Sequence, residues 1–250
     1  MKGLTRHVPN TLTCISLSFG FYAAISGVSG RYFEAMAAIF IASAFDYADG
    51  LAARLLKAYS AIGKELDSLA DVISFGVAPG MMLFCFLNQL LHNLQWSDSL
   101  GGKIFLLAAF ALPVFSALRL AKFNIDDRQK SSFLGLPVPA HAILWSSLIA
   151  LLAAEPGAGY CIFPQLAALF ASIPPGIMLV LLSISAVATS FLLVSRIPMF
   201  SLKMTSFSWK ANRLPYILFI CAVLLILLFG IAGITATIIL YIMLSYFSQL

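Results

Sequence analysis

The sequence predicts an all-α, polytopic integral membrane protein with about eight transmembrane helices. Hydrophobic residues make up 61% of the 250 residues and charged residues only 10%, whereas soluble domains are typically about 45–50% apolar and ~25% charged. The apolar residues also gather in long runs that short basic segments separate. We therefore expect a single membrane-embedded domain over residues 1–250.

Eight apolar segments approach the ~20 residues that a helix needs to cross the hydrocarbon core. In order they are 10–29, 32–56, 64–91, 103–123, 138–154, 174–195, 214–229 and 231–247. The fifth, seventh and eighth are short, and 167–173 either extends the sixth or forms an interfacial turn. A basic leader before an apolar run also opens secretory signal peptides. We expect a retained first helix, because the acidic residues that follow need neighbouring helices around them.

Lysine and arginine are distributed unequally between the two sides of such a bundle. With eight spans, thirteen of the fifteen lie on the side of the two termini, and only Arg31 and Lys103 lie on the other. Basic loops favour the cytoplasmic side. This predicts a protein of the cytoplasmic membrane with both termini facing the cytoplasm, and the net charge of +5 then reflects topology, not nucleic-acid binding.

Four aspartates lie in the stretch 45–71, which reads FDYADGLAARLLKAYSAIGKELDSLAD between apolar segments. Asp46 and Asp49 are three residues apart, and Asp67 and Asp71 are four apart, so each pair shares one face of a helix. Residues 55–62 are numerous enough for a turn that brings the two helices side by side. We expect the four carboxylates to converge near small residues.

Such a cluster is costly unless it binds something. An acidic residue at the centre of a membrane helix costs about 2.5–3.5 kcal/mol. Hard divalent cations such as Mg²⁺, Mn²⁺ or Ca²⁺ remove this penalty, because they prefer carboxylate oxygens. The alternative is a set of helix-end carboxylates that face water or pair with Arg54, Lys57 and Lys64.

The small and basic residues between the aspartates complete a longer pattern. Its fixed positions are Asp46, Asp49, Gly50, Ala53, Arg54, Gly63, Asp67 and Asp71. This pattern resembles the signature of the CDP-alcohol phosphatidyltransferases. The resemblance implies an enzyme that moves a phosphatidyl group from a CDP-linked lipid to an alcohol and releases CMP. It also implies that the first three aspartates hold divalent metal, that the fourth is the base, and that the glycine, alanine and arginine positions line the nucleotide pocket.

The chemistry of these residues agrees with that assignment. One or two Mg²⁺ or Mn²⁺ ions can stabilise the negative charge that builds on a leaving phosphate. The expected ligands are Asp46, Asp49 and Asp67, with Asp71 sharing a metal or acting on the nucleophile. The expected CDP-lipid-binding residues are Asp49, Gly50, Ala53, Arg54, Gly63 and Ser68. Small residues also occur where membrane helices pack closely, which is the alternative explanation for the glycines and the alanine.

Further stretches resemble the phosphatidylserine synthase branch of the family. They are 65–71, 74–79, 119–124, 133–140 and 194–198. The resemblance covers most of residues 8–200. It therefore implies a catalytic core of about 10–200, followed by two further helices at about 214–247.

The branch resemblance implies CDP-diacylglycerol and L-serine as substrates, and phosphatidylserine and CMP as products. Arg119 and Lys122 share a helix face and suit the serine carboxylate, and Asn124 can orient either end of serine. The alternative is that the two cations anchor their helix at the membrane interface.

Two other functions compete with serine transfer. One is a sister phosphatidyltransferase that uses another acceptor, such as glycerol 3-phosphate or inositol phosphate. The other is a cation-binding transporter, against which stands the lack of an inverted repeat of the acidic segment. The family resemblance also implies a homodimer surrounded by membrane lipids.

Overall fold

The computed structural model describes residues 7–125, 133–154, 172–200 and 212–247. These residues are almost entirely helical, which confirms the predicted all-α class. The helices are α2 (Val8–Val28), α3 (Tyr32–Leu55), α4 (Ala61–Asp71), η1 (Val72–Val77), α5 (Ala78–Asn93), α6 (Leu100–Ile125), α7 (Val138–Leu152), α9 (Pro175–Leu193), α10 (Arg213–Phe229) and α11 (Ile231–Phe247). Each of the eight predicted segments is therefore helical. Most of the turn considered at 167–173 lies outside the described residues.

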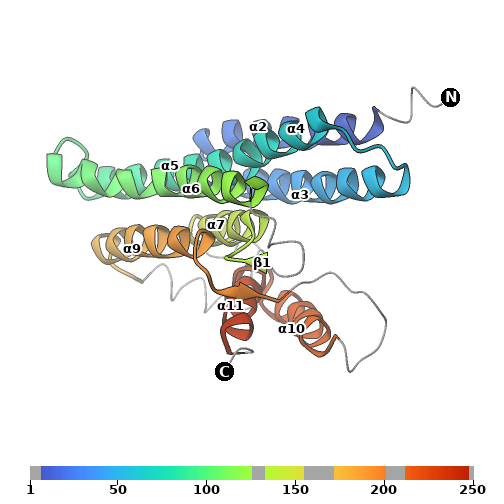
Figure 1. Cartoon of the computed structure of the whole chain (residues 1–250). Helices are drawn as coiled ribbons and strands as arrows, with labels where there is room; N and C mark the ends of the chain where they lie inside the picture. The colour runs from blue at the N-terminus through green and yellow to red at the C-terminus, as the bar shows by residue number, and fades with distance from the viewer. Residues whose placement is uncertain (1–6, 126–132, 155–171, 201–211, 248–250) are drawn as a thin grey trace.

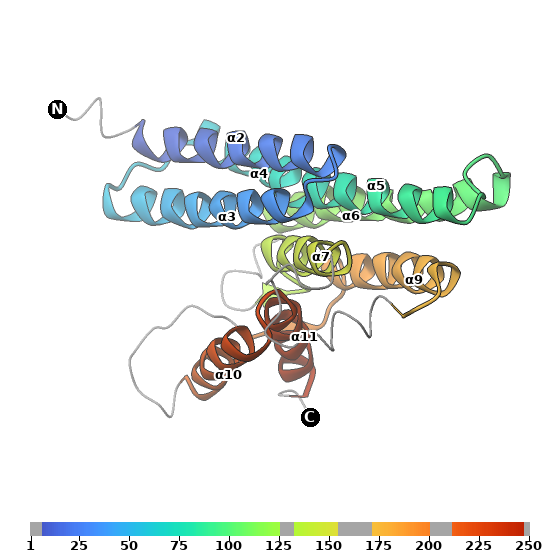
Figure 2. The ribbon, with the colours of Figure 1, turned by 180° about the vertical axis from the view of Figure 1, so that it is seen from behind.

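In the part of the chain that the structure describes, five helical segments are long and apolar enough to cross a membrane. They are Val8–Val28, Tyr32–Leu55, Ala61–Asn93, Leu100–Ile125 and Pro175–Leu193. The other three, α7, α10 and α11, are apolar but have only 15, 17 and 17 residues, which agrees with the short segments predicted there. Figures 1 and 2 show α2 to α6 in one elongated layer, with α3 toward one end and α5 and α6 toward the other. Helices α7 and α9 lie below this layer in both views, and α10 and α11 are inclined to the rest.

Helix α2 packs closely against α3 and η1 through small residues. Ser16 Oγ donates to the Ala42 carbonyl at 2.9 Å, and Ser74 Oγ donates to the Ser16 carbonyl at 3.3 Å. A side chain at Gly20 would overlap Ser74. Small and hydroxyl-bearing residues let membrane helices approach in this way. The first turns of α2 are thereby held beside the acidic ends of α3 and α4.

The third segment is not a uniform α-helix. A π-helical turn, η1, separates α4 from α5 and begins directly after Asp71. A Cβ atom on Gly76 would lie only 3.1 Å from Ser116 Cβ and 3.2 Å from Pro113 Cα, so this turn lies against α6. Single π-helical turns often occur at functional sites. Residue spacing alone did not predict this feature.

Two distant loops meet in a short antiparallel pair of strands. β1 (Phe133–Leu134) pairs with β2 (Pro198–Met199), with Phe133 opposite Met199. Gly135, at φ +77°, donates its N–H to the Ile197 carbonyl at 2.9 Å. The stretches 133–140 and 194–198, which sequence comparison with the family singled out separately, are therefore neighbours in space.

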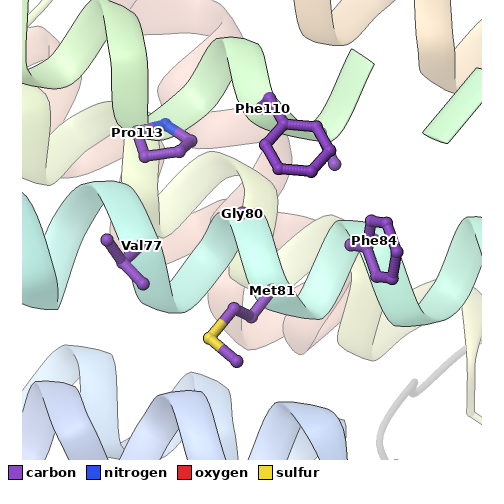
Figure 3. Close-up of a pocket in the computed structure, with 7 residues that line it drawn as sticks. Val77, Gly80, Met81, Phe84, Phe110 and Pro113 are labelled. Carbon is purple, nitrogen blue, oxygen red and sulfur yellow. The ribbon is translucent and has the colours of Figure 1, made fainter. Parts of the chain in front are cut away.

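An apolar hollow of about 270 Å³ lies between α5 and α6 (Figure 3). Its lining residues are Val77, Gly80, Met81, Phe84, Ala109, Phe110 and Pro113. None of these side chains carries a charge or a hydrogen-bond donor, and the Met81 sulfur is only a weak acceptor. The hollow therefore does not suit a phosphate or an amino acid.

Candidate active site

Three of the four aspartates meet where the end of α3 lies beside α4. Asp46, Asp49 and Asp67 each offer a carboxylate oxygen, and these three oxygens lie within 4.8 Å of one another. Asp71 lies beside Asp46 but outside this three-oxygen group. The two acidic pairs, eighteen or more residues apart along the chain, are thus brought together as their helical spacing predicted.

A hydroxyl from α2 holds one of the carboxylates. Thr13 Oγ1 donates to Asp49 Oδ2 at 2.5 Å, and both residues are buried. A hydrogen bond to a carboxylate that binds metal fixes the orientation of that carboxylate, and its loss typically lowers metal affinity or activity about 10–100-fold. Thr13 was not predicted as a site residue, because nothing in the spacing of residues 45–71 points to a partner 36 positions away.

Among the residues that the structure describes, no lysine or arginine lies within ion-pair distance of the four aspartates. Within the described ranges, the one ion pair closer than 4.0 Å joins Arg31 and Glu34, on the opposite side of the bundle from the aspartates by the predicted topology. The described residues therefore do not support the alternative in which the carboxylates pair with Arg54, Lys57 and Lys64. Three hard oxygen donors at this spacing fit Mg²⁺, Mn²⁺ or Ca²⁺, since opposite ligands of Mg²⁺ are about 4.2 Å apart. These aspartates can bind a metal ion.

A polar pocket of about 230 Å³ opens beside the aspartates. It is lined by Pro9, Asn10, Thr13, Asp49, Gly50, Ala53, Arg54, Ala58, Tyr59, Ser60, Gly63, Lys64 and Asp67. These residues come from the start of α2, the end of α3, the following loop and the start of α4. Asp49 and Asp67 belong both to the pocket and to the metal-competent group, so a ligand in the pocket would contact the metal site directly.

Two glycines keep this pocket open. A Cβ on Gly50 would meet only Arg54 Nη1, at 3.7 Å, so the helix surface there faces free space. A Cβ on Gly63 would lie 2.9 Å from both Asn10 Oδ1 and Ser60 Oγ. Ser60 caps α4 by accepting from the Gly63 N–H at 3.0 Å, as serine commonly does at helix N-termini. Asn10, Tyr59 and Ser60 were missed in the sequence, although Ser60 sits at a recognisable N-cap position.

Ser68 and Asn124 are bonded to each other. Asn124 Nδ2 donates to Ser68 Oγ at 2.9 Å, and Ser68 Oγ donates to the Lys64 carbonyl at 3.2 Å. Lys64 Nζ in turn donates to the Asn124 carbonyl at 3.1 Å. Ser68 does not line the polar pocket. This network joins α4 to the end of α6, linking a residue predicted for the CDP-lipid to one predicted for the acceptor.

Arg119 and Lys122 differ in their surroundings. Arg119 is only 8% exposed, lies near Asp71, and has no hydrogen-bond partner for its Nε among the residues that the structure describes. Lys122, one turn on, is exposed. The shared helix face predicted for them therefore holds one buried cation beside the carboxylates and one exposed cation near the helix end.

Fold and site together define the class: a polytopic membrane protein with a metal-competent carboxylate cluster beside a polar pocket. The family model of the CDP-alcohol phosphatidyltransferases matches residues 6–173, which include every aspartate and pocket residue described above. The chain belongs to the CDP-alcohol phosphatidyltransferase family.

Curated relatives carry one name, CDP-diacylglycerol–serine O-phosphatidyltransferase. The protein of Bacillus subtilis is 35% identical over 133 residues, which are 53% of this chain and 70% of that protein. The protein of Helicobacter pylori strain 26695 is 34% identical over 138 residues, 54% of each chain. The protein of Mycobacterium leprae is 33% identical over 199 residues, 77% of this chain and 57% of that protein. The chain thus spans between about half and 70% of the length of these relatives.

Proposed function

We propose that this protein transfers the phosphatidyl group of CDP-diacylglycerol to the hydroxyl of L-serine, giving phosphatidylserine and CMP. The proposal is supported by membership of the family and by the shared name of the relatives. The observation that carries it is the meeting of Asp46, Asp49 and Asp67 beside a polar pocket that Gly50 and Gly63 keep open. A metal-bound pyrophosphate needs both features in one place.

The nucleotide end of the lipid occupies the polar pocket in this proposal. Gly50 and Gly63 give it access to the helix surface, and Arg54 pairs with phosphate oxygens, as a guanidinium does well. Asp46, Asp49 and Asp67 hold the divalent cation, Mg²⁺ or Mn²⁺, and Thr13 keeps Asp49 in place. When bound, the cation supplies charge stabilisation at the pyrophosphate and aligns it for in-line displacement.

Serine enters from the side of Asp71 and Arg119. Asp71 accepts the proton of the serine hydroxyl, whose oxygen attacks the lipid-side phosphorus while the bond from that phosphorus to the CMP oxygen breaks. Arg119 binds the serine carboxylate. Its buried Nε, which lacks a partner among the described residues, is then satisfied, which matters because an unpaired buried donor costs about 1–3 kcal/mol.

The test is CMP release by the purified protein in detergent or nanodiscs, with CDP-diacylglycerol and a panel of alcohols. Release is expected with L-serine and either Mg²⁺ or Mn²⁺, and the lipid product should be phosphatidylserine by mass. Release with glycerol 3-phosphate or inositol phosphate but not with serine would assign a sister activity. Cation uptake into vesicles without any CMP release would favour the transporter.

We also propose where the protein lies in the cell, how it is oriented and how many copies it contains. The protein lies in the cytoplasmic membrane with both termini and the active site toward the cytoplasm, as the distribution of lysine and arginine indicates, and it works as a homodimer, as the family resemblance implies. A C-terminal fluorescent reporter that matures only in the cytoplasm should be bright. Light scattering of the purified protein should give twice the 27.0 kDa of one chain. A dark reporter or a monomeric mass would contradict the respective part.

A further inference from the structure

Helix α6 runs antiparallel to the segment formed by α4, η1 and α5. Far from the aspartates, the rings of Phe84 and Phe110, both labelled in Figure 3, lie edge to face with centroids 6.0 Å apart. Nearer to the aspartates, a Cβ atom on Gly76 would lie 3.1 Å from Ser116 Cβ. The contacts therefore move toward the end of α6 as the other segment is followed back toward Asp71.

At the end of α6 the contact consists of hydrogen bonds. Asn124 Nδ2 donates to Ser68 Oγ at 2.9 Å, and Lys64 Nζ donates to the Asn124 carbonyl at 3.1 Å. Ser68 Oγ donates its own proton to the Lys64 carbonyl at 3.2 Å. The Ser68 hydroxyl thus both donates and accepts within the protein. The Ser68–Asn124 bond ties the last turn of α6 to α4.

Two residues that the proposed function assigns to the acceptor lie between this bond and the Gly76 contact. Asp71 is three residues after Ser68, and Arg119 is three residues after Ser116. Residues three apart on a helix are neighbours on one face, so Asp71 and Arg119 each adjoin a residue that contacts the other helix. The two contacts therefore bracket Asp71 and Arg119 and set how far apart they lie.

Arg119 itself is enclosed in the bundle. It is only 8% exposed, and its Nε has no hydrogen-bond partner among the described residues. A buried guanidinium cannot search for a carboxylate, so the helix that carries it has to be in the right place. The end of a helix opens easily unless side chains hold it, and Asn124 is one residue before the end of α6. The bond from Asn124 to α4 holds this end.

We propose that Ser68 and Asn124 are positioning residues for the alcohol acceptor: their hydrogen bond holds the end of α6 against α4, so that Arg119 and Asp71 face the same acceptor. Neither residue then contacts a substrate, although the sequence analysis assigned Ser68 to the CDP-lipid and Asn124 to serine. The proposal rests on the proposed function, in which Arg119 binds the serine carboxylate and Asp71 accepts the hydroxyl proton. Lys64 does not enter the test, because it also lines the polar pocket.

The test uses Ser68→Ala and Asn124→Ala, assayed by CMP release. Each should lower kcat/KM for serine about fivefold, which corresponds to about 1 kcal/mol, the usual contribution of one hydrogen bond. The KM for CDP-diacylglycerol and the metal concentration for half-maximal activity should stay within about twofold of wild type, because the polar pocket and the metal-binding aspartates are unchanged. Ser68→Thr keeps the hydroxyl and should behave as wild type.

Two matched controls remove the same groups elsewhere. Ser18→Ala removes an exposed hydroxyl that donates to the Cys14 carbonyl four residues back, as Ser68 does to the Lys64 carbonyl. Asn93→Ala changes an exposed asparagine at the last position of α5. Both should leave kcat/KM for serine unchanged. A fivefold fall in either control would overturn the proposal, because the loss of any such polar group would then have the same effect.

A double-mutant cycle separates positioning from direct contact with a substrate. The double variant Ser68→Ala/Asn124→Ala should lose about fivefold in kcat/KM for serine, not the ~25-fold expected of independent sites, because both changes break one bond. Independent effects, a fall in Asn124→Ala alone, a raised KM for CDP-diacylglycerol in Ser68→Ala, or equal changes in all three constants would each overturn the proposal.

Failure of the proposed function is seen in the wild-type protein instead. If the wild-type protein releases CMP only with another alcohol, the serine assignment is wrong, and the same variants are compared with that alcohol. A matching, non-additive fall in its kcat/KM would support the positioning role, and an unchanged kcat/KM would overturn it. If the wild-type protein releases no CMP with any alcohol, the proposed function and the positioning role are both wrong.

Discussion

The hydrogen bond from Thr13 to Asp49 allows a sharp test of the metal site. Thr13→Val replaces the hydroxyl with a methyl group of nearly the same size, so the buried contact with α3 is kept while the donor to Asp49 Oδ2 is lost. A hydrogen bond to a charged group contributes about 1.5–3 kcal/mol. Groups that orient a metal ligand typically change metal affinity or activity by about 10–100-fold when removed. The two estimates agree.

The assay is CMP release as a function of Mg²⁺ or Mn²⁺ concentration. The metal concentration for half-maximal activity should rise by about 10–100-fold in Thr13→Val, with much of the lost activity recovered at high metal. Thr11→Val is the control, because Thr11 is on the same helix, is exposed, and donates only to the His7 carbonyl. An unchanged metal requirement in Thr13→Val, or an equal shift in Thr11→Val, would refute the role given to this bond.

Three other substitutions separate the parts of the site. Asp71→Asn should lower turnover by about 10²–10⁴-fold, the range of general acid–base catalysis, with little effect on CDP-diacylglycerol binding; wild-type turnover would remove Asp71 as the base. Gly63→Val should raise the KM for CDP-diacylglycerol about tenfold, because overpacking costs about 1–3 kcal/mol. Gly101→Val, where a side chain would enter open space, should leave this KM unchanged. If the two variants had the same KM, the nucleotide would bind elsewhere. Asp46→Asn should raise the melting temperature without metal and abolish its increase with Mn²⁺, while the exposed Asp98→Asn should behave as wild type; a normal Mn²⁺ effect in Asp46→Asn would contradict its place among the ligands.

The sequence predicted what depends on local spacing. Helical periodicity placed Asp46 with Asp49 and Asp67 with Asp71, and the chain between the two pairs is long enough to reverse direction, so their meeting could be inferred. Hydropathy predicted all eight helical segments, because an apolar run in lipid has to satisfy its backbone hydrogen bonds within the run itself. The small residues of the pocket followed from the same helical faces.

Contacts between distant segments could not be predicted in this way. Nothing near Thr13 indicates that it faces Asp49, and nothing near Tyr241 indicates that it bonds the Phe200 carbonyl. Both contacts depend on how helices pack across the bundle, which periodicity leaves open. The two final helices looked like generic apolar sequence, yet α11 bonds to the end of β2, where Tyr241 Oη donates to the Phe200 carbonyl.

The acidic cluster shows why the stability of this protein and its proposed activity should oppose each other. Two unit charges 4.8 Å apart repel by about 3.5 kcal/mol at an effective dielectric constant of about 20, and three carboxylates at no more than this separation make the metal-free site unfavourable. No described lysine or arginine lies within ion-pair distance to relieve that repulsion. A local salt bridge would stabilise the fold, but it would occupy the oxygens that a cation needs. A cation and its phosphate-bearing substrate can supply the missing charge, so the repulsion in the metal-free site favours their binding.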